Sequence, residues 1–400
     1  MGETVISRRL LLASLLAVCF PGGVKAALKD TRNHAPALPA YRIRLPRDHG
    51  AHPSFRTEWW YFTGWFEAGG DGTSPIGIQI TFFRTAPHSD PDNPARMAPH
   101  QLLLAHVAVA SIQNGKLVHD QIARRTGLSD TGMSEVDSEG RFELRIGKWL
   151  LQRRADGVWV AQIRSAEMDL RCEFEPTQPE WLQGDAGFSR KGPRAEQASH
   201  YITLAHLASR AELRLRKDAL TRRLTGKTWM DHEWSSSVLD ERAVGWDWVG
   251  LHGDDGSSLM AFRIRGKDAA SAAGGDIWQH AQLRLADGRV VSFAKIRFEV
   301  LQKWTSPRTG TEWPISLRLV LDHTVFELRP LMPDQELDSR MSTGTVYWEG
   351  AVQVFRRPAG PTGAAARDSG TSREGASAGD TVRWGKGYLE LTGYWKPMKL

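Results

Sequence analysis

The sequence predicts an all-β protein built from two antiparallel β-barrel or β-sandwich domains. Turn signals that need a positive φ recur along the chain, namely Asp71-Gly72, Asn114-Gly115, Asp156-Gly157, Asp255-Gly256 and Asp287-Gly288. Segments beside them alternate apolar and polar residues, as at residues 149–153 and 158–163. Beyond residue 26 no stretch has a helical period. Many short strands joined by tight turns are typical of barrels and sandwiches.

Length and composition agree with this class. The chain has 400 residues, 41% hydrophobic and 24% charged, which fits two globular domains and excludes disordered, collagen-like and coiled-coil chains. Its 16 tryptophans against 6 tyrosines indicate aromatic-walled cores or cavities. The net charge of +6 comes without a compact Lys/Arg block interleaved with aromatic residues, so a nucleic-acid partner is not expected.

Residues 1–26 have the features of a signal peptide. A basic start with Arg8 and Arg9 precedes an apolar run at residues 10–20, which is too short to span a membrane, and a small-x-small cleavage pattern ends at Ala26. The paired arginines fit a twin-arginine signal and equally a basic start on a general secretory signal. Cys19 does not favour lipid attachment, because Val18 stands before it where a small residue is needed. We expect a periplasmic or secreted protein.

The mature chain divides into two expected domains, at residues 41–226 and 227–400. Residues 357–380 are dominated by Gly, Ala, Ser, Pro and Thr, which predicts a flexible surface loop before a last strand. Cys172 is the one cysteine left after cleavage, and it lies in a segment that alternates like a strand. We expect a buried structural thiol and no intrachain disulfide.

Several familiar chemistries lack support. There is no Walker motif and no G-x-G-x-x-G after a strand. A G-x-S-x-G at residues 375–379 lies in the low-complexity segment, without the strand and helix of a nucleophile elbow. His232 stands between two acids but has no second histidine at i+4, and neighbouring strand residues point to opposite faces. A zinc site would need ligands from distant parts of the chain, and we expect neither a metal nor another cofactor.

The most informative segments are residues 228–237 and 245–250. Strand alternation places Trp246 and Trp248 on one face and Asp247 on the other, which is apolar. Burial there would raise the pKa of Asp247 and make it a candidate general acid. The alternative is an ion pair with an arginine of a neighbouring strand. His232 and Trp234 share a face, where the imidazole can orient water and the indole can stabilise a cation. The alternative is that Asp231 and His232 cap a turn and Trp234 is a core residue.

Two further polar residues lie in apolar segments. Glu58 shares a face with Trp60, among aromatic residues, and its alternative role is an ion pair with Arg56 or Arg84. His106 has small neighbours that leave room for a ligand, although a satisfied core histidine explains it as well.

Residues 52–64, His-Pro-Ser-Phe-Arg-Thr-Glu-Trp-Trp-Tyr-Phe-Thr-Gly, resemble the opening signature of the AttH-type, CrtC-like family. Its members are often labelled carotenoid 1,2-hydratases or predicted secreted hydrolases. Further matching pieces follow in order along the chain, at residues 79–84, 229–237, 245–248, 347–350 and 391–394.

This resemblance implies two lipocalin-like domains that hold a hydrophobic or isoprenoid-like ligand in or between them. In the hydratase branch, water adds across a terminal alkene of an acyclic carotenoid by acid–base chemistry without a cofactor. The family's His-x-Trp pair and nearby acid match His232, Trp234 and Asp247, which we expect to be catalytic. The tyrosine that the family places close to this acid is not evident, because tryptophans flank Asp247.

We expect the ligand to contact Glu58, Trp60, His106, Trp246, Trp248 and Tyr347. The resemblance leaves two alternatives open. One is a non-catalytic, lipocalin-like lipid-binding component linked to an ABC transporter, with peripheral membrane contact. The other is a secreted hydrolase, for which no convincing nucleophile stands in the sequence.

Overall fold

The computed structural model describes residues 34–68, 74–86, 101–267, 275–357 and 381–398. The predicted signal peptide, the G-x-S-x-G and all but the first residue of the predicted loop 357–380 lie outside the described residues. No helix in the described ranges has the length and hydrophobicity needed to cross a bilayer.

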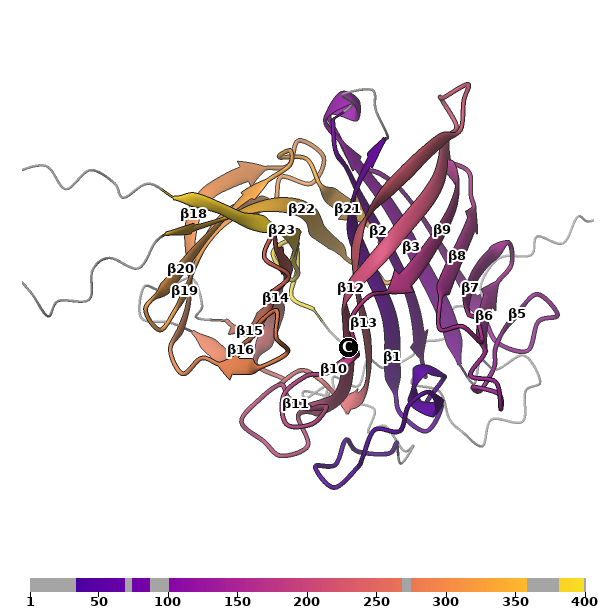
Figure 1. The fold of residues 1–400 in the computed structure, drawn as a ribbon, viewed down its shortest axis with the longest axis horizontal. Coiled ribbons are helices and arrows are strands. Elements are labelled where there is room, and N and C mark those ends of the chain that lie inside the picture. The colour runs from indigo at the N-terminus through magenta and orange to yellow at the C-terminus, as the bar shows by residue number, and fades with distance from the viewer. Residues whose placement is uncertain (1–33, 69–73, 87–100, 268–274, 358–380, 399–400) are drawn as a thin grey trace, which may run out of the picture.

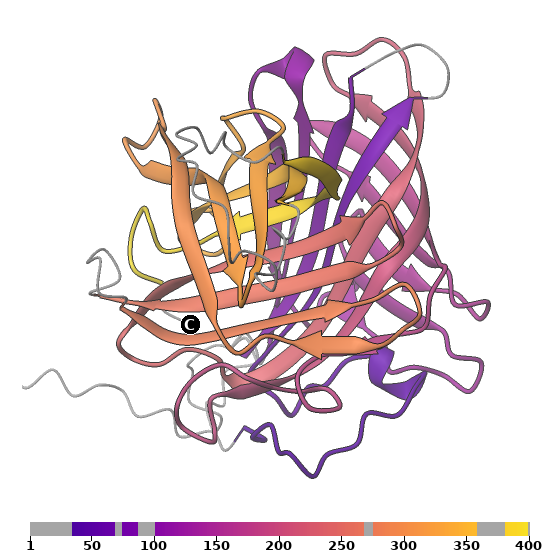
Figure 2. The same ribbon diagram turned by 60° about the vertical axis from the view of Figure 1, so that its left-hand side comes forward.

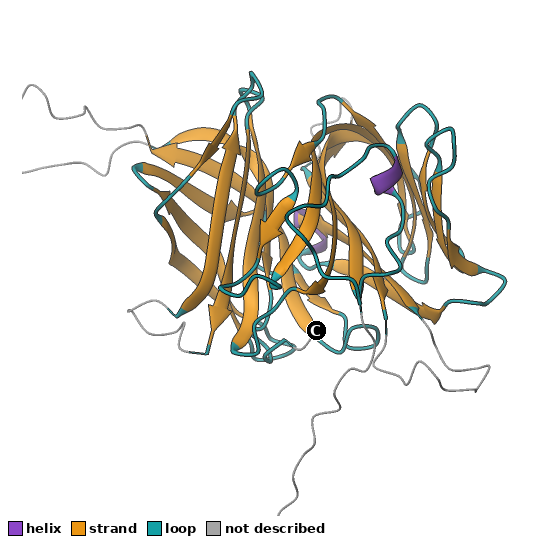
Figure 3. Ribbon diagram, turned by 90° about the horizontal axis from the view of Figure 1, so that it is seen from below, coloured by secondary structure: helices purple, strands orange, loops and turns teal. Residues whose placement is uncertain are grey.

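Strands dominate both halves of the molecule (Figures 1 and 3). The first sheet contains β1 (Thr57–Ala68), β2 (Ile76–Thr85), β3 (Leu102–Ser111), β4 (Val118–Arg125), β5 (Thr131–Met133), β6 (Phe142–Ile146), β7 (Trp149–Arg153), β8 (Trp159–Arg164), β9 (Met168–Pro176), β10 (Trp181–Leu182), β11 (Phe188–Arg190), β12 (Ala198–Leu215) and β13 (Arg222–Ser237). The second sheet contains β14 (Ala243–Gly253), β15 (Ser258–Gly266), β16 (Asp276–Arg284), β17 (Val290–Ser292), β18 (Ile296–Thr305), β19 (Glu312–Leu321), β20 (Thr324–Pro330), β21 (Glu336–Asp338), β22 (Val346–Arg357) and β23 (Val382–Leu391). Two short 3-10 helices, η1 (Arg47–His49) and η2 (Ile112–Asn114), complete the described elements.

All strand pairs in the described parts of both sheets are antiparallel, and most of them are sequential hairpins. In the first sheet the order is β4-β3-β2-β1-β13-β12-β9-β8-β7-β6-β5, so β13 returns to pair with β1. This sheet curls into a nearly closed barrel, the first barrel. The second sheet forms a half-barrel beside it, the second barrel (Figure 1). The all-β prediction with two antiparallel domains is therefore confirmed.

The change from one sheet to the other falls later in the chain than residues 226–227. Strand β13 runs unbroken through this predicted boundary and pairs with β1 as far as Ser235 and with β12 as far as Ser237. The second sheet begins at Ala243 with β14. The motif at residues 228–237 thus belongs to the first barrel, and the motif at residues 245–250 belongs to the second sheet.

The predicted tight turns that fall on described residues connect strands as expected. Gly157 joins β7 to β8 and Gly288 joins β16 to β17, with φ of 84° and 87°, a region that favours glycine. Asp71-Gly72 lies outside the described residues.

Alternation along each strand divides the apolar residues among three cores. Trp60 and Phe62 of β1 point into the first barrel, whereas Val249 and Leu251 of β14 point into the second. The opposite faces of the same strands meet in a third core between the sheets, which includes Trp65. Figures 1 and 2 show the second sheet against the β1–β13 side of the first, and contacts join β1 with β23 and β12 with β14.

Cys172 is fully buried inside the first barrel, as predicted for a structural thiol. Burial raises its pKa well above the usual range. A thiol held in its neutral form is a poor nucleophile.

Candidate functional site

A cavity of about 790 Å³ lies between the two domains. Strands β1, β2, β12 and β13 line it from the first domain, and β14, β15, β22 and β23 line it from the second. Most of these strand residues have side chains that point away from the two barrel interiors; Glu58 and Arg84 are exceptions. Its walls include Trp59, Phe83, Trp246, Trp248, Phe262 and Ile264, so a ligand inside would meet mainly aromatic and aliphatic surface.

Carboxyl groups are the polar side chains that distinguish this cavity. Asp231 of β13 is buried and accepts hydrogen bonds from Tyr201 Oη at 2.7 Å and Thr203 Oγ1 at 2.6 Å. Trp248 Nε1 donates to the same Tyr201 oxygen at 3.1 Å. Burial, and secondarily the charge of Glu233, raises the pKa of Asp231 to about 7, although the two hydroxyl donors oppose the rise. Asp231 can therefore exchange a proton near neutral pH.

Glu349 and Glu390 form a second acidic group on the opposite wall. They are paired residues of β22 and β23, and Trp248 of β14 pairs with Glu390 on its other side. Trp246 Nε1 donates to Glu390 Oε1 at 3.1 Å. Burial raises the pKa of Glu390 to about 8, with the charges of Asp231, Glu233 and Asp247 adding to it. Burial and the charge of Glu390 raise the pKa of Glu349 well above its usual range.

A buried ion pair lies at the first-domain side. Lys191 Nζ is 2.8 Å from Glu233 Oε1, which also accepts a hydrogen bond from Ser199. The Lys191 ammonium lies 4.2 Å from the ring centre of Phe262 and 4.7 Å from that of Tyr201. The aromatic wall therefore already stabilises one positive charge.

Tyr347 connects the cavity to the first domain through a chain of hydrogen bonds. Its hydroxyl contacts His106 Nδ1, His106 Nε2 is 2.8 Å from Ser342 Oγ, and that hydroxyl donates to Gln121 Oε1 at 2.7 Å. Burial lowers the pKa of His106 to about 3, so the ring is neutral and joins two hydroxyl groups. His106 is a satisfied histidine that orients Tyr347 toward the cavity.

Four of the six predicted ligand-binding residues line the cavity, namely Trp246, Trp248, Tyr347 and Glu58. The carboxylate of Glu58 is bonded to Arg84 inside the first barrel. Trp60 points into the first barrel. His106 reaches the cavity only through Tyr347.

Asp247 lies in the second barrel, where two arginines neutralise it. Arg263 Nη2 is 2.7 Å from Oδ2, Arg265 Nε is 3.0 Å from Oδ1, and both arginines come from the neighbouring strand β15. The ion-pair alternative therefore describes Asp247, and the cavity lining does not include it. Tyr394 Oη donates to Asp247 at 3.1 Å, so a tyrosine does lie beside this acid, from a distant part of the chain.

His232 and Trp234 point into the first barrel, on the face of β13 opposite Asp231. The structure does not bring these two predicted catalytic residues together with Asp247, because they face the interior of the first barrel and Asp247 faces that of the second. Burial lowers the pKa of His232 to about 4, and its ring stacks 4.6 Å from Trp60. Trp234 stacks 3.8 Å from the ring of His52.

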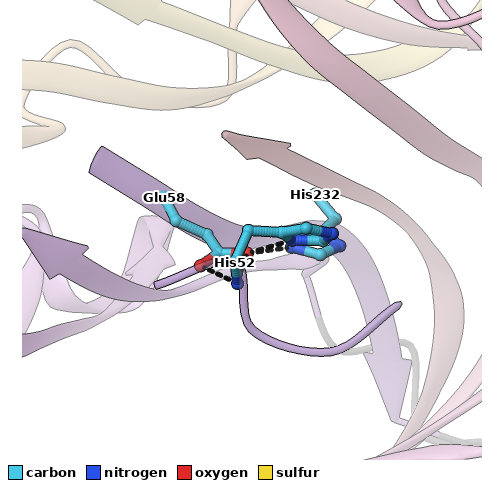
Figure 4. A group of neighbouring side chains, drawn as sticks. All are labelled: His52, Glu58 and His232. Atoms are coloured by element: carbon cyan, nitrogen blue, oxygen red, sulfur yellow. Dashed lines mark hydrogen bonds and ion pairs between the residues drawn. The ribbon is translucent and has the colours of Figure 1, made fainter. Parts of the chain in front are cut away.

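Figure 4 shows the network in which His232 takes part. Glu58 Oε1 is 2.8 Å from His52 Nδ1 and 2.9 Å from His232 Nε2. Arg84 Nε, which the figure does not draw, donates to Glu58 Oε2 at 2.9 Å. The ion pair proposed for Glu58 with Arg84 is thus present. Burial alone would raise the pKa of Glu58, but hydrogen bonds from both histidines lower it below its usual range.

The same three side chains could in principle hold a metal ion. Their possible ligand atoms all lie within 4.8 Å of one another, and no other such group is found among the described residues. The backbone N–H of His52 also donates to both oxygens of Glu58. Protein donors, one of them the Arg84 cation, already surround the carboxylate, so the network fits a structural role better than a metal site.

Sequence reasoning missed Asp231, Glu349, Glu390, Tyr201 and Lys191. Strand alternation contains part of the signal, because Asp231 flanks His232 and Glu349 stands two residues after Tyr347. The missing information was which face of each strand meets the other domain. That depends on how the two sheets pack.

Comparisons with known proteins give a consistent assignment. The AttH-like family model matches residues 36–394. A crystal structure assigned to AttH from Nitrosomonas europaea is 39% identical, covers 90% of this chain and 99% of its own, and superposes with a TM-score of 0.76. None of the curated proteins compared by sequence matches significantly.

Two more distant structures share the fold. Kievitone hydratase from Nectria haematococca is 11% identical over 91% of this chain and 97% of its own, with a TM-score of 0.61. CghA in complex with Sch210972 is 14% identical over 85% of this chain and 89% of its own, with a TM-score of 0.51. The family match spans both domains, and the chain therefore belongs to the AttH-like family.

Proposed function

We propose that this protein is a cofactor-free hydratase that adds water to an alkene of an apolar small molecule in the cavity between its domains. One observation carries the proposal: carboxyl groups whose pKa lies at or above neutrality face a large cavity with aromatic walls. The likeness in fold to kievitone hydratase supports the same reaction class.

The cavity offers one carboxyl group as general acid and another as general base. Glu390, with a pKa of about 8, is mostly protonated at neutral pH and can give its proton to one alkene carbon. The alkene π electrons form the new C–H bond, which leaves a carbocation on the other carbon and a carboxylate on Glu390. The faces of Trp246 and Trp248 can stabilise this cation.

Asp231 is suited to the second step. Hydrogen bonds from Tyr201 and Thr203 favour its charged form, so a fraction is ionised at neutral pH. A water molecule attacks the cation through its oxygen, and Asp231 accepts the proton that this water loses. Proton exchange with solvent then returns Asp231 and Glu390 to their starting states.

The test is turnover of defined probes in water labelled with heavy oxygen. Farnesol, lycopene and a prenylated phenol each carry an alkene bearing two methyl groups, and mass spectrometry would detect one added labelled water. We expect product with the wild type, and about a hundredfold less or lower with Glu390→Gln or Asp231→Asn, in keeping with the usual contribution of general acid–base catalysis. Glu312→Gln, an exposed carboxylate on β19, is the matched control. Absence of labelled product with every probe would contradict hydration of this alkene class.

A non-catalytic carrier is the second candidate, favoured by the mainly apolar cavity walls. Such a protein would bind the same probes without labelling them. In either case we propose that the features of residues 1–26 direct the protein to the periplasm or outside the cell, where a carrier could deliver its ligand to an ABC transporter.

A further inference from the structure

Three carboxyl groups of the cavity have no cationic partner among the residues that the structure describes. Asp231, Glu349 and Glu390 make no ion pair within the described part of the chain, although buried carboxyl groups are usually paired. The charges that act most strongly on Glu349 and Glu390 are those of other acids. Lys191, a buried ammonium group of the lining, is already paired with Glu233 at 2.8 Å.

Two polar atoms in the same region have no hydrogen-bond partner among the described residues. They are Glu349 Oε2 and Tyr61 Oη, both buried on residues that line the cavity, which are 3% and 5% exposed. Carboxyl and phenol oxygens both accept hydrogen bonds, so a ligand with N–H donors would give Glu349 Oε2 and Tyr61 Oη the partners that they lack. A positive charge on the same ligand would favour the ionised form of Glu349, which burial otherwise disfavours.

The aromatic walls suit the same kind of group. Rings attract cations to their faces, and Lys191 shows this within the cavity, with its ammonium 4.2 Å from the Phe262 ring centre. Trp246 and Trp248 lie beside Glu390 on the face where the acidic pair is found. Acids and indole faces together form a surface complementary to an organic cation.

We propose that the ligand of this cavity is an amphipathic organic cation, with an ammonium group between Glu349 and Glu390 and an apolar body against Trp246 and Trp248. This inference names a ligand class for the same cavity and rests on that cavity being the binding site. An ammonium group would favour the ionised form of Glu390, the acid that hydration needs, so such a ligand would compete with a neutral alkene and the two proposals can fail separately.

The test compares three probes with the same chain length: decylammonium, decanol and decanoate, each below its micelle concentration. Binding is followed by quenching of tryptophan fluorescence at neutral pH. We expect decylammonium to bind about tenfold or more tightly than decanol, and decanoate to bind most weakly. In a Glu349→Gln/Glu390→Gln variant this preference should disappear while decanol still binds, which shows that the cavity is intact.

Glu312→Gln should keep the order of the wild type. Decanol binding as tightly as decylammonium in the wild type would overturn the proposal. So would a preference for decylammonium that survives in the double variant. Loss of labelled-water incorporation with neutral alkenes would instead count against the hydratase and leave the cation preference standing.

Discussion

Glu349 and Glu390 lie directly opposite each other on β22 and β23, and both line the cavity between the domains. Side chains opposed in this way on one face have Cβ atoms roughly 5 Å apart. Two ionised carboxylates at this spacing and in little water would repel each other strongly. Burial raises the pKa of both groups, so the pair holds a proton at neutral pH.

The proposed reaction should have a narrow pH optimum. It needs Glu390 protonated, which fails as the pH rises through about 8, and Asp231 ionised, which fails as the pH falls through about 7. We expect kcat/KM for a hydrated probe to be bell-shaped, with its maximum between these values. Asp231→Asn should remove the acidic limb from the residual activity. A flat profile across this range would argue against both assignments.

The acidic pair should also make the fold less stable in alkali. The pKa of Glu390 is raised from 4.5 to about 8 on folding, so the folded state binds the proton more tightly. The resulting stability is complete below the unfolded pKa and is lost as the pH rises through about 8. We expect urea unfolding to show a loss of a few kcal/mol between pH 5 and pH 9.

The Glu349→Gln/Glu390→Gln variant removes both titrating groups, so its free energy of unfolding should change less over this interval. Glu312→Gln should follow the wild type. If the double variant keeps the full pH dependence, the titrating groups lie elsewhere.

Glu58 should matter for stability at low pH. Hydrogen bonds from His232 and His52 lower its pKa on folding, so the stability it gives is present above the unfolded value and is lost as the pH falls. Glu58→Gln leaves the buried Arg84 without its carboxylate, at a cost of roughly 3–5 kcal/mol. Thermal unfolding near neutral pH checks this. Full stability in this variant would show that the network contributes little.

A chelator gives a second check on the same network. Protein donors surround Glu58, so EDTA should leave the melting temperature unchanged. A lower melting temperature, restored by a divalent ion, would show that His52, Glu58 and His232 hold a metal.

Asp247 should be structural. Asp247→Asn leaves Arg263 and Arg265 without their shared carboxylate inside the second barrel and should destabilise the fold by roughly 3–5 kcal/mol. Because Asp247 does not line the cavity, kcat/KM of the folded variant should stay within about twofold. The reverse result, normal stability with lost turnover, would restore Asp247 as the catalytic acid.

The fold could be predicted from local signals. Glycine turns such as Asp156-Gly157 and period-two alternation define hairpins. Both signals come from residues that are close together in the sequence, so the sequence alone shows them. Alternation also separated Asp247 from Trp246 and Trp248 correctly.

The site could be predicted only in part, because it depends on contacts between distant segments. The tyrosine beside Asp247 is Tyr394, and the acid opposite Glu349 is Glu390, both supplied by the last part of the chain. Alternation puts Asp231 and His232 on opposite faces of β13 but does not say which face meets the second sheet. The packing of the two sheets decides that Asp231 enters the cavity.

Infrared difference spectroscopy of the carboxyl groups tests the central claim most directly. At neutral pH the wild type should show the C=O stretch of a protonated carboxyl in an apolar setting, shifted in heavy water and lost as the pH rises past about 8. The band should weaken in Glu390→Gln and persist in Glu312→Gln. A wild-type spectrum without any protonated carboxyl at neutral pH would contradict an acid held ready in this cavity.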